Sequence, residues 1–203
     1  MGMGLLILMM AAIMIGGVIW VGRSFFGQHV GNEPEISSGQ KLLNEPTDKT
    51  VARLSVRGPI TAEEEHYSIV ISVGPTSRSL VIFRGYNGET MENVTLGNSE
   101  KSFKDFVAAL NRASFMKESN NTDGNQGICA VGQLLQFEML NNDKSAEKLW
   151  STSCPNLTGN FGGLQSNVID LFLGQIPTSR SLINKAKRTL DQEHTDANLN
   201  VLY

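Results

Sequence analysis

The stretch that decides the fold is residues 51–59, VARLSVRGP. Its first seven residues alternate, with the apolar side chains of Ala52, Leu54 and Val56 on one face and polar side chains on the other. This period of two is typical of a β-strand that buries one face. The Gly-Pro pair that follows ends the strand. The sequence therefore predicts a folded domain that begins near Val51 with a half-buried strand.

Three more strand patterns follow before any helix. Residues 67–73 alternate in the same way, residues 80–83 are rich in strand-forming side chains, and residues 91–96 are expected as a further strand. The pair Asn87-Gly88 lies between the last two and is typical of a tight hairpin turn. We therefore expect consecutive strands to pair in an antiparallel way.

The clearest helix pattern surrounds Phe103, where apolar residues recur at i, i+3, i+4 and i+7, and Asn98 or Ser99 is expected to cap it. Two further strand patterns and a second helix pattern lie at residues 128–140, 149–154 and 164–172. This order predicts an α+β domain, with a mainly antiparallel sheet of about six strands and two packed helices.

The chain opens with an apolar segment, residues 1–22, that carries no charged side chain. A helix of that length spans about 33 Å, close to the roughly 30 Å hydrocarbon core of a bilayer. The segment lacks the basic leader and small-residue cleavage site of a signal peptide, and so long a charge-free run is seldom a core helix of a small domain. We therefore expect an uncleaved transmembrane anchor over residues 1–26, with the membrane as the partner of residues 1–22.

Composition sets the other domain boundaries. Residues 27–50 are polar and rich in Gly and Pro, with no aromatic side chain, which predicts a flexible linker. Residues 51–177 form the predicted domain. In residues 178–203, a thin apolar stripe predicts a peripheral helix to about Leu190, and a disordered tail is expected beyond Asp191.

The chain has two cysteines, Cys129 and Cys154, both at the ends of predicted strands. A disulfide between them would close a loop of about 25 residues and stabilise the fold by about 3.5 kcal/mol through chain entropy. The alternative is two reduced, buried thiols. A bridge fits an oxidising compartment outside the cytoplasm, whereas Arg23, the basic residue next to the apolar segment, favours a cytoplasmic domain. We expect the bridge and an extracytoplasmic domain.

The densest polar cluster is Glu63-Glu64-Glu65-His66. Carboxylates and an imidazole are able to act as general acids and bases or as metal ligands. The cluster lacks the paired histidines at i and i+4 that a zinc helix needs, and runs of charge are usually solvated. We therefore expect a solvated turn between strands, and an envelope-acting hydrolase that uses Glu63, Glu65 and His66 is an alternative.

Four arginines are candidate binding residues: Arg53, Arg57, Arg78 and Arg84 lie on predicted strands or turns. If the strands form a meander, several of these arginines would share one sheet face. Such a face suits an anionic polymer or phosphate, although outward-facing charges also discourage edge pairing. The aromatic candidates for contacts are His66, Tyr67, Tyr86 and Trp150, and core packing explains Trp150 equally well.

Short motifs appear in order along residues 51–177. They include Val56-Arg57-Gly58-Pro59-Ile60, His66-Tyr67-Ser68-Ile69, Gly127-Ile128-Cys129-Ala130-Val131-Gly132 and Leu149-Trp150-Ser151-Thr152-Ser153-Cys154. As a set, they resemble an uncharacterised family of small, single-span, exported proteins of reduced-genome epibiotic bacteria. The resemblance implies an exported domain with these limits, and a disulfide, because both cysteines are shared in that family. It implies no activity, since none is established for the family.

Composition and motifs narrow the function. With 17 Lys and Arg against 20 Asp and Glu, the net charge is −3, so the chain has no large cationic field for nucleic acid. Two Cys and three His exclude a zinc-ribbon or iron–sulfur framework. The sequence has no phosphate-binding loop and no nucleophile elbow, and we assign no catalytic residue, metal or cofactor.

We therefore expect a non-catalytic, membrane-anchored, extracytoplasmic binding or interaction module of the cell envelope. Its expected partner is an envelope protein or an anionic polymer. A pilin-like filament subunit is a second alternative, because an apolar N-terminal segment precedes a sheet and a late disulfide loop. That alternative lacks the expected early glutamate, since no acidic residue occurs before Glu33.

Overall fold

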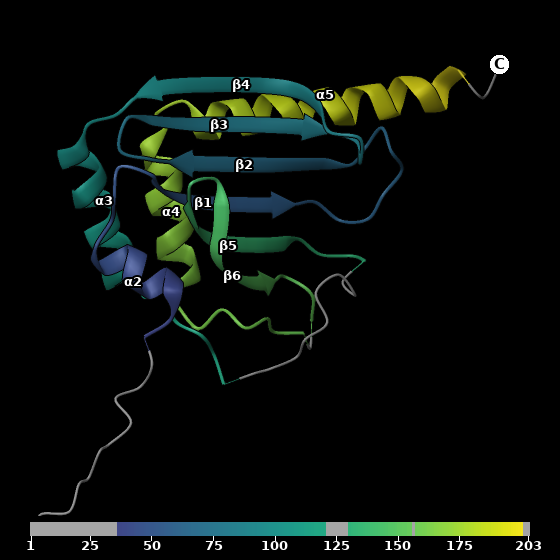
Figure 1. Cartoon of the computed structure of the whole chain (residues 1–203). Helices are drawn as coiled ribbons and strands as arrows, with labels where there is room; N and C mark the ends of the chain where they lie inside the picture. The colour runs from purple at the N-terminus through teal and green to yellow at the C-terminus, as the bar shows by residue number, and fades with distance from the viewer. Residues whose placement is uncertain (1–35, 121–129, 156, 201–203) are drawn as a thin grey trace, which may run out of the picture. The chain divides into compact units, whose positions relative to one another are not determined.

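Six strands form one antiparallel sheet in the computed structural model of the protein (Figure 1), which describes residues 36–120, 130–155 and 157–200, with side chains to residue 192. The strands are β1 (Thr50–Arg57), β2 (Tyr67–Val73), β3 (Ser77–Arg84), β4 (Glu89–Gly97), β5 (Leu134–Asn141) and β6 (Lys144–Thr152). Their order is β4-β3-β2-β1-β5-β6, and every neighbouring pair is antiparallel. The predicted α+β class and the antiparallel sheet are confirmed.

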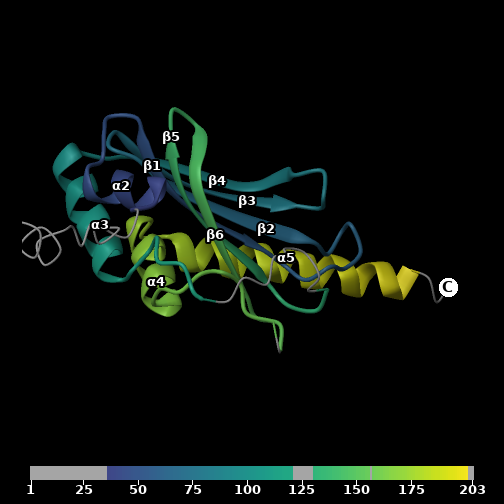
Figure 2. The ribbon, with the colours of Figure 1, turned by 60° about the horizontal axis from the view of Figure 1, so that its bottom comes forward.

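The described residues form four helices: α2 (Ser38–Asn44), α3 (Glu100–Arg112), α4 (Gln165–Gln175) and α5 (Ser179–Asn200). Figure 2 shows α4 and α5 along one face of the sheet, where α4 contacts β2 and α5 contacts β3 and β4, and it shows α3 beside the ends of the strands, where α3 packs against α4. Helix α2 packs against α3 and the β5–β6 hairpin. No helix among the described residues covers the other face of β1, β2 and β3, which we call the open face.

Phenylalanines join the sheet to the helices. Phe137 of β5 stacks on Phe161 at 3.9 Å between ring centroids and meets Phe115 edge-on at 6.1 Å. Phe172 of α4 contacts Phe115 at 5.6 Å and Phe106 of α3 at 5.2 Å. Aromatic pairs of these kinds stabilise the fold beyond what the burial of their surface contributes. The core therefore runs from the centre of the sheet into the α3–α4 pair.

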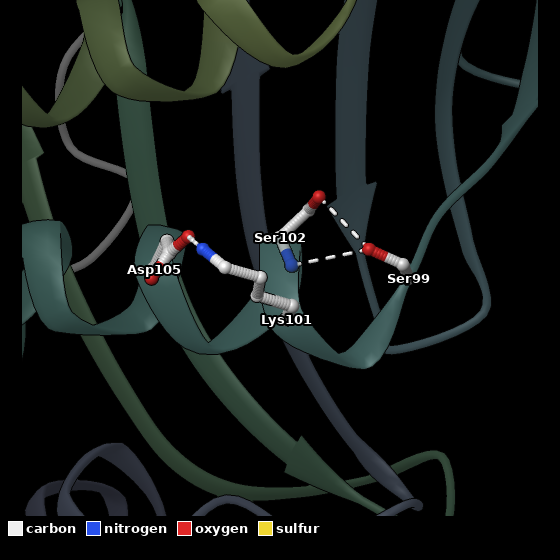
Figure 3. Close-up of polar contacts among 4 residues, drawn as sticks. All are labelled: Ser99, Lys101, Ser102 and Asp105. Carbon is white, nitrogen blue, oxygen red and sulfur yellow. Dashed lines mark hydrogen bonds and ion pairs between the residues drawn. The ribbon is translucent and has the colours of Figure 1, made fainter.

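The start of α3 follows the sequence prediction (Figure 3). Ser99 is the N-cap residue, and its hydroxyl accepts a hydrogen bond from the Ser102 backbone N–H at 3.2 Å. In the first turn of the helix, Lys101 Nζ lies 2.7 Å from Asp105, and both side chains are exposed. The hydrogen bond to Asp105 and then the attraction between the charges raise the pKa of Lys101 above its usual value.

Helix α2 lies inside the segment that the sequence assigns to a flexible linker, so the structure corrects that boundary: the folded unit begins at Ile36. Leu43 of α2 is buried in the core. At the start of the helix, the Glu147 carboxylate of β6 accepts hydrogen bonds from the Gly39 N–H and the Ser37 hydroxyl. A partner from a distant strand stabilises a helix that has few apolar residues of its own.

The β5–β6 hairpin and helix α5 are also longer than the sequence patterns predict. Asn142 and Asp143 form the hairpin turn with φ of +53° and +61°, and β6 begins at Lys144 rather than near residue 149. The first half of β6 is an exposed edge strand, so it carries no apolar alternation. Helix α5 continues to Asn200, past Asp191, where the sequence predicts a disordered tail.

Within the part of the chain that the structure describes, no helix has both the length and the apolar character that a membrane crossing requires. The predicted anchor, residues 1–26, lies outside the described residues.

Candidate functional site

The open face is built from rows of side chains that cross the strands. The pairing register places three such rows on it. The row at the end of β1 consists of Thr90, Phe83, Ser68, Arg57, Leu134 and Thr152. The middle row consists of Asn93, Val81, Val70, Ser55, Gln136 and Trp150. The third row consists of Thr95, Ser79, Ser72, Arg53, Glu138 and Lys148.

A cleft of about 390 Å³ lies over the first of these rows. Phe83, Ser68, Arg57 and Leu134 form its floor, and Trp150 of the next row closes one side. The loop of residues 58–66, between β1 and β2, and the turn of residues 85–88, between β3 and β4, supply its walls. The volume falls in the range of small-molecule sites, and the lining mixes aromatic rings with one guanidinium group.

Polar contacts join the two walls, and we call these contacts the latch. Glu63 Oε1 accepts a hydrogen bond from the Tyr86 backbone N–H at 3.0 Å. It also accepts two from Asn87, one from the backbone N–H at 3.4 Å and one from the side-chain amide at 3.2 Å. Tyr86 Oη donates to the Thr61 carbonyl at 2.8 Å and accepts from the Thr61 N–H at 3.1 Å. The latch therefore holds the turn against the loop.

His66 completes the wall behind the latch. Its ring stacks on that of Tyr86, with 4.0 Å between centroids and 13° between planes. Nδ1 lies 3.0 Å from the Pro59 carbonyl oxygen. Because a carbonyl oxygen only accepts, Nδ1 carries the proton and Nε2 is the acceptor of the neutral ring. With 6% of its surface exposed, His66 is a buried part of the cleft wall, whereas the sequence predicts a solvated turn.

Trp150 lies on the open face, outside the hydrophobic core cluster, although only 4% of it is exposed. The Trp150 backbone N–H donates to Asn160 Oδ1 at 2.8 Å, and the Trp150 backbone carbonyl accepts from the Phe161 N–H at 2.9 Å. Segment 159–161 therefore holds this end of β6 in place. The sequence leaves two roles open for Trp150, a contact residue of a binding site or a core residue. Its position in the cleft supports the first role.

The four arginines do not form one patch. Arg53 and Arg57 of β1 lie on the open face, whereas Arg78 and Arg84 of β3 share the helix-covered face with Val73 and Tyr67. The reason is register, because directly paired residues of neighbouring strands point to the same side. Of the four, only Arg57 lines the cleft.

Tyr67 and the residues of the acidic cluster, Glu63 to His66, do not all lie at the cleft. Tyr67 faces α5, with Lys187 Nζ at 5.6 Å from its ring centroid, and it lines a second cavity with Glu65. Glu63 belongs to the latch, and Glu64 is exposed. The three carboxylates therefore do not converge on His66. Among the described residues, no three His, Cys, Asp or Glu side chains gather as metal ligands would.

Cys129 lies outside the described residues, so its disulfide with Cys154 remains a prediction.

Phe83 and Leu134 are cleft residues that the sequence did not single out. Strand alternation is the signal that identifies both residues. Phe83, for example, lies at an outward-facing position of a strand that buries Leu80 and Ile82 on its other face. A large apolar residue at an outward position signals a surface with a binding role. The same signal applies to Leu149-Trp150, where two adjacent large residues must face opposite sides of the sheet.

We expect a Glu63→Ala substitution to lower the free energy of unfolding by about 1 kcal/mol, because it removes the acceptor for three N–H groups of the turn. The matched control is Glu64→Ala, which we expect to change stability by less than about 0.5 kcal/mol, since Glu64 is exposed. Urea unfolding of both variants measures the difference. Equal losses would contradict the role given to the latch.

No family model matches the chain. The search of curated proteins likewise finds no match.

Proposed function

We propose that the protein is a non-catalytic, membrane-anchored binding module of the cell envelope, and that the cleft binds an organic anion with an apolar or planar body. The observation that carries the proposal is the lining of the cleft. Trp150, Phe83 and the stacked His66–Tyr86 pair surround it, and Arg57 is the only permanently charged side chain among the described lining residues.

This lining has a clear chemical preference. A guanidinium group presents paired N–H donors that match a carboxylate or phosphate. Aromatic faces bury flat or apolar groups with little loss of conformational freedom, because the rings are already packed. An anion without an apolar body would leave the rings unused, and a neutral apolar molecule would leave Arg57 without a partner.

The cellular setting in the proposal rests on the sequence. The charge-free residues 1–22 support a membrane anchor, and the two cysteines support an extracytoplasmic domain with an envelope protein or an anionic polymer as partner. A free-thiol count on denatured, unreduced protein from its own cells checks the location. Zero free thiols are expected, and two free thiols would instead favour a cytoplasmic domain.

The two alternatives have less support. A hydrolase that uses Glu63, Glu65 and His66 would need these groups in one place, and they face the latch, the second cavity and the cleft, respectively. A pilin-like subunit would need one helix from the N-terminus past residue 40. Residues 36 and 37 are not helical, and Ser37 caps a separate helix.

The proposed function is tested with 4-phenylbutyrate, which joins a phenyl ring to a carboxylate, and with its neutral amide. The full chain carries Trp20→Phe and is held in phosphatidylcholine vesicles, so that Trp150 is the one tryptophan and its fluorescence measures binding. For a ligand of this size, about −0.3 kcal/mol per non-hydrogen atom corresponds to a Kd of roughly a few millimolar. We expect the acid to bind about fivefold more tightly than the amide.

An Arg57→Gln variant should lose this preference for the acid. The matched control is Arg53→Gln, which changes the same residue type on the same strand and face but outside the cleft. We expect the control to keep the preference. An absence of binding, or an equal loss in both variants, would contradict the proposed function.

A further inference from the structure

Exposed apolar side chains gather at the mouth of the cleft. Ile60 is 61% exposed, Tyr86 52% and Val131 79%. Ile60 and Tyr86 line the cleft, and the Ile60 N–H donates to the Ala130 carbonyl at 2.8 Å, which brings Val131 to the same edge. An apolar rim that extends beyond a small-molecule cavity is typical of a surface that contacts a macromolecule.

The charge changes sign between the inside and the rim of the cleft. Arg57 lies on the floor, whereas Glu63 and Glu64 are exposed on the loop that forms one wall. A complementary partner therefore has an anionic tip that enters the cleft and cationic groups next to it.

We propose that the ligand is a peptide segment of a protein partner, with a carboxylate and an apolar side chain in the cleft and basic residues against the glutamates of the rim. This inference rests on the proposed function and names its ligand. The floor crosses four strands, about 14 Å, which is the length of about four extended residues. An anionic lipid surface fits the apolar rim but not its glutamates, which would repel the headgroups.

The test compares defined probes on the same Trp20→Phe chain. The main probe is an octapeptide with two lysines, a short Ser-Gly spacer and a terminal Phe-Leu with a free carboxyl group. Three other arms are the amidated octapeptide, the octapeptide with glutamates in place of the lysines, and phosphatidylglycerol vesicles. A further arm is an amidated octapeptide with aspartate next to its C-terminus. It shows whether the cleft binds a side-chain carboxylate as well as a terminal one.

We expect the octapeptide to bind about tenfold more tightly than 4-phenylbutyrate, and amidation to raise its Kd about fivefold. Glutamates in place of the lysines should also raise the Kd. A Val131→Ser variant should weaken octapeptide binding about threefold and leave 4-phenylbutyrate binding unchanged, because Val131 lies on the rim and not in the cleft.

The outcomes separate the two proposals. If 4-phenylbutyrate binds and the octapeptide binds no more tightly, the peptide inference is wrong and the proposed function stands. If neither binds, both are wrong. Tighter binding to phosphatidylglycerol vesicles than to the octapeptide would assign the rim to a lipid surface and overturn the peptide inference.

Discussion

A Phe137→Ala substitution is expected to lower the free energy of unfolding by about 3–5 kcal/mol, the largest effect of any single change considered for this protein. Phe137 has no exposed surface, and its ring contacts Phe115 and Phe161. Its loss would leave a cavity between the centre of the sheet and the α3–α4 pair. For a domain of this size, we expect the Tm to fall by roughly 10 °C.

Phe83→Ala is the matched control, because it removes the same side chain from the opposite face of the sheet. Phe83 is half-buried and forms part of the cleft floor, so we expect it to cost about 1 kcal/mol. Its main effect should be a higher Kd for 4-phenylbutyrate. Thermal and urea unfolding of both variants gives the comparison. A similar loss of stability from the two would contradict the division into a core face and an open face.

Gly85→Ala is expected to have the second-largest effect, a loss of about 2–3 kcal/mol. Gly85 has a φ of +66°, which is costly for any residue with a Cβ atom. An added Cβ would also lie 2.5 Å from Glu63 Oε1, so the carboxylate would have to move and the latch would open. Since Tyr86 follows directly, we also expect weaker binding of 4-phenylbutyrate.

Gly88→Ala separates the two causes. Gly88 has a φ of +78°, so it carries the same backbone penalty, but no atom lies within 4 Å of its added Cβ. We therefore expect this control to cost about 1–2 kcal/mol, the backbone part alone. Urea unfolding measures both variants. Equal losses would show that the contact of residue 85 with Glu63 contributes nothing to stability.

Local patterns predicted most of the architecture. The alternation in residues 51–57 and 67–73 identifies β1 and β2, because a half-buried strand needs a period of two. Asn87-Gly88 lies in the turn between β3 and β4, and Ser99 caps α3 as expected. These features depend on residues that are close in the sequence, so the sequence contains the information needed to find them.

The elements that were missed depend on distant partners. Helix α2 has few apolar residues, and besides its local cap Ser37, its N-terminus binds Glu147, which lies more than a hundred residues away. The first half of β6 is polar because it lies at an edge of the sheet, and pairing with β5 rather than its own pattern makes it a strand. Neither contact leaves a local signal.

Local sequence patterns predict most of the strands with their buried faces and the main helix, together with the apolar N-terminal segment and the types of residue available for binding. Which of those residues meet depends on the tertiary structure. Strand register divides the arginines between two faces and places Arg57 in one row with Phe83 and Leu134. The latch then brings Tyr86 onto His66 across the mouth of that row. The physical reason is that a row across a sheet joins one residue from each strand, and pairing and loop closure, rather than local periodicity, select those residues.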